Sequence, residues 1–300
     1  MPPAPAASTA RPQRVLLIAN PISGGGRGRD LAPQLAHELT ARGVRAEVFL
    51  TAAAGDAEAR AAAAGEEAWD ALVALGGDGT VNEVLNGMPD PTRPLGVLPV
   101  GTANVLALEL ALPREPAAAA EVIAGGRTHP LTVGVCDGRR FLLFVGVGVD
   151  GAIVRRLSEV RTGTLGKHKW LAPLLHTVRR WPQFRLRVTC DGGAPVDEVA
   201  SVLVTRVRTY GGIMTLPDAD RDSGELHVLM FHMRSRLPWL VHGLRAVFGG
   251  LRPGPHLTVR RAREVRVEGA APFQIDGDFG GESPLHVGLL EQQARIFAPA

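Results

Sequence analysis

The sequence Gly-Gly-Asp-Gly-Thr at residues 76–80 combines a glycine-rich turn with an acidic side chain. The apolar run 71–75 before it has the pattern of a buried strand, and residues 81–87 after it have a helical pattern. Glycine lets a backbone come close to a ligand, and the start of a helix offers unpaired N–H groups that bind phosphate. Asp78 would repel a phosphate unless a metal ion or a proton lay between them. The turn therefore predicts phosphoryl chemistry, in which Asp78 acts through a magnesium ion.

A purely structural interpretation of the same turn is a tight connection between a strand and a helix, with Asp78 as the helix cap. A cap accounts for one aspartate and one glycine. It does not require the three glycines that surround Asp78. The phosphate interpretation explains more of the pattern.

Strand-like and helix-like segments alternate through the first part of the chain, from residue 14 to about residue 130. Single helices between strands predict an α/β domain that has a parallel sheet with helices on both faces. Ligands bind such sheets beyond the carboxyl ends of the strands. Three glycine-bearing loops fall at those ends, and we expect them to converge on one crevice: residues 20–26, 76–80 and 101–102.

Strand-like runs separated by turns dominate from residue 131 to residue 288, which predicts a second, mainly antiparallel β-sandwich domain. Helical patterns interrupt the strands at 153–161, 170–181 and 238–248. A last strand-like run, 294–297, has no assigned partner, so residues 289–300 could complete the first domain. Residues 1–13 are rich in proline and alanine and predict a disordered leader rather than a secretory signal.

The composition places few limits on function. The chain has 300 residues, 45% of them hydrophobic and 21% charged, with a net charge of +3. Lysine occurs only at positions 167 and 169, so nearly all basic residues are arginine. A GC-rich genome explains this bias most simply, and a surface that holds phosphate groups is the alternative. Two isolated cysteines, Cys136 and Cys190, predict buried thiols in a reducing cytoplasm.

Further motifs occur in a fixed order along most of the chain. Asn-Pro-Ile-Ser-Gly at 20–24, the acidic turn with its following helix at 76–83, and Leu-Pro-Val-Gly-Thr-Ala-Asn at 98–104 come first. Gly-Val-Gly-Val-Asp-Gly at 146–151 and Gln-Ile-Asp-Gly-Asp at 274–278 come later. This ordered set resembles the diacylglycerol kinase catalytic family, which also contains sphingosine kinases. The resemblance implies an ATP- and Mg²⁺-dependent lipid kinase with its active site in the cleft between the two domains.

By resemblance, nucleotide contacts fall on the loops at the ends of the first-domain strands and on one residue of the second domain. An ordinary Asn-Pro turn is an alternative for the loop at 20–24. The residues that the resemblance assigns to nucleotide binding are Asn20, Pro21, Ser23, Gly24, Thr51, Gly76, Gly77, Asp78, Gly79, Thr80, Asn82, Glu83, Thr102 and Asp278.

Asp276 is the predicted catalytic residue. Transfer of a phosphoryl group to an alcohol needs a group that orients the hydroxyl and accepts its proton. In the resembled kinases the first acid of Asp-Gly-Glu has this role, and here the sequence is Asp-Gly-Asp at 276–278. The shorter second acid, Asp278, puts its own contact in doubt. A hairpin turn is the structural alternative, because Asp-Gly favours type I′ turns.

The acidic segment 217–226 resembles a loop that binds a structural magnesium, with Asp220 and Asp222 as candidate oxygen ligands. Ser223 stands where that loop often has aspartate, so a solvated acidic turn is an equal alternative. The stretch 155–187 is basic and contains two tryptophans, which suits peripheral contact with an anionic membrane. A solvated helix pair with buried tryptophans is the alternative.

Three hypotheses for function follow. The first is an ATP-dependent cytoplasmic lipid kinase that acts at a membrane surface, binds no nucleic acid, and most readily converts diacylglycerol to phosphatidic acid; a homodimer is left open. The second is an NAD kinase, which shares the Gly-Gly-Asp-Gly turn but not the sequence at 98–104. The third is a non-catalytic nucleotide or lipid sensor, which Ser223 and Asp278 support.

Overall fold

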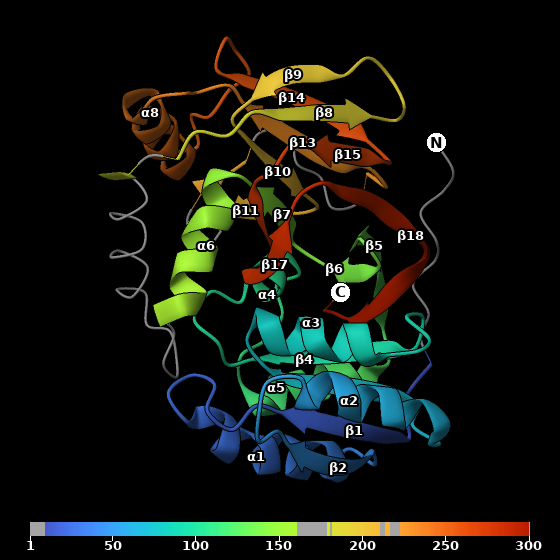
Figure 1. The fold of residues 1–300 in the computed structure, drawn as a ribbon. Helices are drawn as coiled ribbons and strands as arrows, with labels where there is room; N and C mark the ends of the chain where they lie inside the picture. The colour runs from blue at the N-terminus through green and yellow to red at the C-terminus, as the bar shows by residue number, and fades with distance from the viewer. Residues whose placement is uncertain (1–9, 161–178, 181, 211–213, 217–222, 300) are drawn as a thin grey trace. The chain divides into compact units, whose positions relative to one another are not determined.

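The computed structural model describes residues 10–160, 179–180, 182–210, 214–216 and 223–299 (Figure 1). The chain divides into two compact units. Unit 1 comprises Met1–Thr132 and Glu291–Ala300, and unit 2 comprises Val133–Leu290. The predicted leader lies almost wholly outside the described residues, as do the predicted helix at 170–181 and most of the basic stretch 155–187.

Unit 1 is built on a parallel sheet in the strand order β2-β1-β3-β4. The apolar runs of β1 and β3 are buried at nearly every position, as expected for strands covered on both faces. The four strands are β1 (Arg14–Ala19), β2 (Arg45–Leu50), β3 (Ala71–Gly76) and β4 (Pro94–Pro99).

The described residues of unit 1 form five α-helices: α1 (Arg27–Ala41), α2 (Asp56–Ala63), α3 (Asp78–Gly87), α4 (Val105–Glu109) and α5 (Pro116–Gly125). Helices α1 and α5 pack together on one face, where Leu35 and Ile123 meet Leu17 and Val73 of the strands. Helices α2 and α3 pack against each other and contact β1 and β3. The α/β prediction for this part of the chain is therefore confirmed, and α5 is a helix that the sequence reading did not assign.

The last strand of the chain, β18 (Leu285–Phe297), explains the unassigned run at 294–297. Its end pairs in parallel with β4 through Arg295 and Ile296, so the C-terminus extends the sheet of unit 1. Its beginning pairs antiparallel with β15 (Val265–Glu268) in unit 2. The strand therefore belongs to both units.

Unit 2 contains a six-stranded antiparallel sheet in the order β14-β13-β10-β7-β16-β17. A second layer continues from β18 and β15 to β8 (Leu186–Cys190) and β9 (Val196–Val199). Side chains from both layers form one hydrophobic core, so the β-sandwich prediction is confirmed. The six strands are β14 (Leu257–Ala262), β13 (Leu226–Phe231), β10 (Ser201–Thr205), β7 (Phe144–Val147), β16 (Pro272–Ile275) and β17 (Asp278–Glu282).

The remaining described elements of unit 2 are two helices, α6 (Val149–Val160) and α8 (Arg236–Val247), and four short or bridging strands. The strands are β5 (Thr128–Cys136), β6 (Arg139–Phe141), β11 (Thr209–Tyr210) and β12 (Met214–Thr215). No helix among the described residues is long and apolar enough to cross a bilayer. Cys136 and Cys190 are free buried thiols, as predicted.

The apolar run at 141–149 alone indicates one continuous strand, but the structure divides it. The structure ends β6 at Phe141 and begins β7 at Phe144. The N–H groups of Leu142 and Leu143 donate to the Asp276 carboxylate instead of to a neighbouring strand. A side-chain acceptor that is distant in sequence thus interrupts an apolar run that alone indicates one continuous strand.

Candidate active site

The three glycine-bearing loops of unit 1 meet at the carboxyl ends of its parallel strands. The N–H groups of Val100 and Gly101 donate to the Gly76 carbonyl at 2.8 and 3.3 Å. A Cβ on Gly101 would lie 2.5 Å from the Gly77 Cα, and a Cβ on Gly24 would lie 2.4 Å from the Val100 oxygen. Only glycine allows these approaches, since contacts this short exclude a side chain.

Asp78 joins two of these loops. It begins α3, and its carboxylate accepts the N–H groups of Val105 and Leu106 at 3.1 and 3.3 Å, at the start of α4. Burial raises the pKa of Asp78, and hydrogen bonds from backbone N–H groups oppose this rise. The cap interpretation thus describes its geometry, although the helix that it caps is α4 and not its own helix.

Asn104 is a residue of this loop cluster that the predicted site omits. It adopts a left-handed conformation with φ of 49° before α4, and its Nδ2 donates to the Gly101 carbonyl at 2.8 Å. Its Oδ1 is buried and has no hydrogen-bond partner among the described residues. Asparagine before a helix is a known cap signal, and that signal could have identified the position from the sequence.

The loop at 20–26 has the geometry of an Asx turn. The Asn20 Oδ1 accepts the N–H of Ile22 at 3.1 Å, and the Asn20 N–H donates to the Leu75 carbonyl at 2.9 Å. Ser23 is buried. These bonds fix the loop beside β3, so the simple-turn alternative describes the bonding of Asn20. The close approach of Gly24 to Val100 places the loop within the cluster.

The other predicted nucleotide contacts differ in their exposure. Thr80 and Asn82 are buried, and the Asn86 Nδ2 donates to the Asn82 Oδ1 at 3.0 Å within α3. Thr102 is exposed. The half-buried members of the predicted set are Asn20, Pro21, Gly24, Thr51, Gly77, Asp78, Gly79 and Glu83. Thr102 is therefore the most exposed of the predicted nucleotide contacts in unit 1.

In unit 2, Asp276 lies in a tight turn after β16. Its φ is 49°, and its carboxylate accepts the N–H groups of Leu142, Leu143 and Phe144 at 2.8, 3.0 and 2.9 Å. The hairpin alternative is therefore correct as a description of its backbone. The three bonds fix the position of the carboxylate, which a residue that orients a substrate hydroxyl also requires.

A polar network joins this turn to α6. The Gln274 Oε1 accepts the N–H of Gly277 at 2.7 Å, and its Nε2 donates to the Asp150 carboxylate at 2.7 Å. The Tyr210 hydroxyl donates to the other Asp150 oxygen. Burial raises the pKa of Asp150 and, together with the Asp150 charge, that of Tyr210. Asp150 and Gln274 belong to the motifs at 146–151 and 274–278, but neither of them nor Tyr210 is among the predicted site residues.

The prediction of Asp220 and Asp222 as metal ligands stays a prediction. Asp220 and Asp222 lie outside the described residues, and Asp278 is an exposed residue of β17. Within the described part of the chain, no three His, Cys, Asp or Glu side chains gather in a metal-binding group. Ser223 is described, and its Oγ accepts the N–H of Glu225 at 3.3 Å, which closes a short turn.

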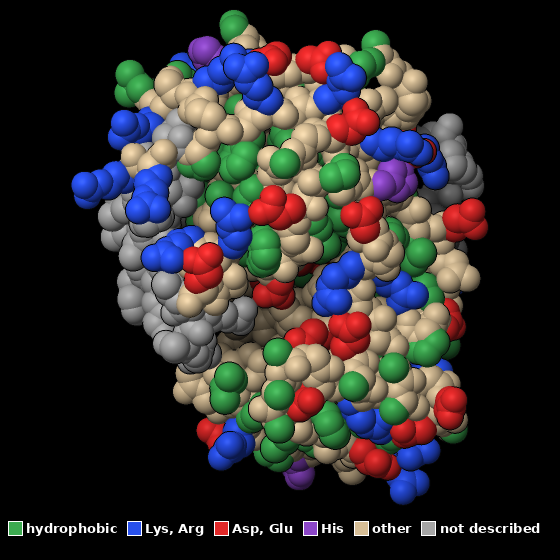
Figure 2. Space-filling view, in the orientation of Figure 1, with side chains coloured by type: hydrophobic (Ala, Val, Ile, Leu, Met, Phe, Trp, Pro, Cys, Tyr) green, Lys and Arg blue, Asp and Glu red, His purple; other side chains and the backbone are tan. Residues whose placement is uncertain are grey.

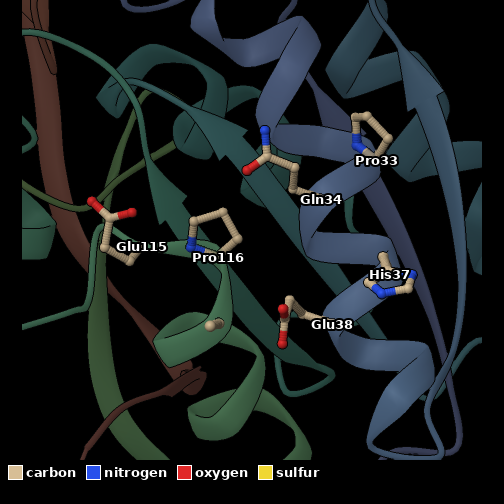
Figure 3. Close-up of a pocket in the computed structure, with 7 residues that line it drawn as sticks. Pro33, Gln34, His37, Glu38, Glu115 and Pro116 are labelled. Carbon is tan, nitrogen blue, oxygen red and sulfur yellow. The ribbon is translucent and has the colours of Figure 1, made fainter.

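Two pockets lie outside the loop cluster. The first is a groove between α1 and α5, lined by Pro33, Gln34, His37, Glu38, Glu115, Pro116 and Ala117 (Figure 3). None of these residues belongs to the predicted site. The second lies in unit 2 beneath α8. It is lined mainly by apolar side chains, including Leu203, Met214 and Phe231, and has Asp150 and Tyr210 at its wall.

Comparisons with known proteins show the family of this chain. Residues 14–136 match the family model described as diacylglycerol kinase catalytic domain. Residues 144–298 match the model described as YegS C-terminal NAD kinase beta sandwich-like domain. A protein named diacylglycerol kinase from Bacillus subtilis (strain 168) is 30% identical to the chain, over 96% of this chain and 97% of its own length. The chain belongs to the diacylglycerol kinase family. The resemblance stated from the sequence is thus confirmed.

Other relatives of the diacylglycerol kinase family extend this result. A protein of the same name from Staphylococcus aureus (strain MRSA252) is 29% identical over 96% of this chain and 93% of its own. A solved structure titled a putative diacylglycerol kinase from Bacillus anthracis str. Sterne has a TM-score of 0.78, with 24% identity over 97% of this chain and 99% of that chain. That likeness supports the fold.

Proposed function

We propose that this member of the diacylglycerol kinase family transfers the γ-phosphoryl group of ATP to the hydroxyl of diacylglycerol, giving phosphatidic acid. The observation that carries the proposal is the junction of glycines 24, 77 and 101 at the carboxyl ends of the parallel sheet. Phosphates bind where backbone N–H groups are accessible and side chains are absent. The proposed occupant of this junction is the triphosphate of the nucleotide.

Magnesium suits this junction as a companion of the nucleotide. Magnesium keeps several waters and is usually held by one or two carboxylates together with substrate phosphates. Asp78 is the carboxylate within the loop cluster, and its oxygens accept two helix N–H groups. It would therefore reach such an ion through water, in line with its predicted role. When bound, the ion neutralises charge on the phosphates.

Asp276 is the proposed acceptor of the hydroxyl proton. As the lipid oxygen forms its bond to the γ-phosphorus, the bond from phosphorus to the ADP oxygen breaks, and the proton passes to the Asp276 carboxylate. The bonds from residues 142–144 hold that carboxylate in one position. The apolar pocket beneath α8, with Asp150 and Tyr210 at its wall, suits a ligand with a long hydrocarbon part.

The test is the transfer of labelled phosphate from ATP to diacylglycerol, sphingosine and NAD, offered separately. We expect label in phosphatidic acid. NAD is included because the matched model of residues 144–298 names NAD kinase in its description. Label in NADP would replace the proposal with the second hypothesis, and tight ATP binding without transfer to any acceptor would favour the non-catalytic one.

Nucleotide binding at the glycine junction is tested by a matched pair of substitutions. In Gly101→Ala the added Cβ would lie 2.5 Å from the Gly77 backbone, so we expect ATP affinity to fall about tenfold or more. The control is Gly125→Ala in α5, where a Cβ meets nothing within 4 Å. Equal ATP affinity of the two variants, measured by calorimetry, would contradict nucleotide binding at this junction.

A further inference from the structure

Helix α8 exposes an apolar face to solvent. Leu237, Leu244 and Phe248 are 72%, 61% and 83% exposed. Phe248 directly follows the helix, and the other exposed apolar residues of this face are Leu240, Val241 and Val247. Their spacing of three and four residues places them on one side of the helix. Large side chains exposed together in this way indicate an interaction surface.

The opposite face of α8 already anchors the helix in unit 2. His242 and Ala246 are buried, and Trp239, Gly243 and Ala246 line the apolar pocket beneath the helix. A helix at the surface of a protein normally has one apolar face and one polar face. Helix α8 has apolar residues on both, so its exposed face is not needed for the packing of the unit. We call this face, residues 237, 240, 241, 244, 247 and 248, the α8 patch.

Arginines surround the α8 patch. From residue 232 to residue 263 every residue of fixed charge is an arginine. Arg236 lies at the start of the helix, Arg245 in its last turn and Arg252 shortly after it, and all three are exposed. Arg234 pairs with Glu198. Figure 2 shows blue and green side chains side by side over α8, at the upper left.

Two occupants of such a face can be compared, a second copy of this chain and a lipid bilayer. A second copy of this chain would bring arginines against arginines, which opposes association. A spanning helix is excluded for α8, because 12 residues extend about 18 Å and a hydrocarbon core is about 30 Å thick. An anionic bilayer accepts apolar side chains at its interface and attracts arginines at its headgroups. We propose that the α8 patch docks this protein on an anionic lipid surface, with α8 lying in the plane of the interface.

This inference rests on the proposed function, because an enzyme that phosphorylates diacylglycerol must reach the membrane in which that lipid resides. It differs from the sequence prediction, which assigned membrane contact to residues 155–187. The binding itself requires no ATP and no catalysis, so it can be measured separately from phosphoryl transfer.

The experiment is sedimentation of the full chain with vesicles, without ATP. One set contains phosphatidylcholine alone, and the other contains equal parts of phosphatidylcholine and phosphatidylglycerol. The test variant is Leu244→Ala/Phe248→Ala. The control variant is Val48→Ala/Leu50→Ala on β2, whose side chains are 40% and 45% exposed in unit 1. A second test variant, Arg245→Gln/Arg252→Gln, keeps the apolar residues.

We expect the wild type and the β2 control to bind the anionic vesicles alike. Loss of two apolar anchors should weaken that binding by about tenfold or more. Loss of two arginines should weaken it by about fivefold per charge, and this effect should fade at high salt.

Unchanged anionic-vesicle binding of both test variants would overturn the inference, even if one of them folds poorly. A concentration-dependent dimer that Phe248→Ala dissociates would overturn it in favour of a second copy as the occupant. Vesicle binding through α8 without phosphoryl transfer would leave the inference standing and refute the proposed function.

Discussion

Three turns of unit 2 share one local design but differ in their surroundings. Each has an aspartate with positive φ followed by a glycine: Asp137 at 45°, Asp191 at 49° and Asp276 at 49°. Asparagine and aspartate tolerate this left-handed conformation better than other side-chain-bearing residues. From sequence alone all three are hairpin turns of the Asp-Gly type.

The three aspartates also bond alike. Asp137 accepts the N–H of His286 at 3.0 Å, and Asp191 accepts the N–H groups of Arg263 and Glu264 at 2.8 and 2.9 Å. Asp276 accepts three N–H groups from residues 142–144. Backbone bonding of the carboxylate is thus a shared structural feature, and it does not by itself identify a catalytic acid.

The Asp276 turn is distinguished by its link to the Gln274, Asp150 and Tyr210 network. The bonds of the Asp191 turn are exposed, whereas those of the Asp276 turn are partly buried. The local geometry of the Asp276 turn is common to structural turns. Its polar network and its partial burial are therefore what make it a candidate site.

The largest stability difference should separate Asp276→Ala from Asp191→Ala. Asp276→Ala leaves three partly buried N–H groups without their acceptor, so we expect a loss of about 2–3 kcal/mol. Asp191→Ala frees two exposed N–H groups that water can reach, so about 1 kcal/mol or less is expected. Urea unfolding measures both values. Equal losses would show that the two turns are energetically equivalent.

Titration of Tyr210, the single tyrosine of the chain, tests the network that distinguishes the Asp276 turn from the other two. Its pKa is raised well above 10 by burial and by Asp150, so the native protein should show no phenolate absorbance at the pH where free tyrosine ionises. The unfolded chain loses its proton near pH 10 while the folded chain keeps it, so stability should fall as pH rises beyond 10. Phenolate absorbance with a midpoint near pH 10 in the folded protein would contradict the network.

Thiol labelling should show the smallest effect. Cys136 directly precedes Asp137, and burial together with the Asp137 charge raises its pKa to about 12. Cys190 precedes Asp191, and burial raises its pKa also. Thiolate is the reactive form, so neither thiol should react with iodoacetamide at pH 8 in the folded protein. Asp191→Ala should speed labelling of Cys190 alone; equal acceleration of Cys136 would mean that the turns do not open independently.

Much of unit 1 could be predicted, because β1 and β3 are buried on both faces and appear in the sequence as continuous apolar runs. The rule for ligand sites in parallel sheets also predicted that the three glycine loops converge. Helix α5 was missed, although Pro116 at its start and Gly126 after its end are typical helix boundaries. β17 contains two glycines in five residues and gives no strand pattern.

Tertiary contacts account for what the sequence could not predict in the candidate site. The carboxylate of Asp78 caps a helix that begins 27 residues later, and Asp276 bonds residues more than 130 positions earlier. Local pattern carries no information on such pairs. The network of Asp150, Tyr210 and Gln274 likewise joins three motifs that are distant along the chain.

Asp276 is the proposed acceptor of the proton in phosphoryl transfer to a lipid hydroxyl. The most direct test is the kcat for labelled phosphate transfer from ATP to diacylglycerol, measured for Asp276→Asn and Asp191→Asn. Asparagine keeps the left-handed turn and one acceptor oxygen but is not a base. We predict a loss of about 10²-fold or more for Asp276→Asn and a change within about twofold for Asp191→Asn. Full turnover of folded Asp276→Asn would contradict the claim.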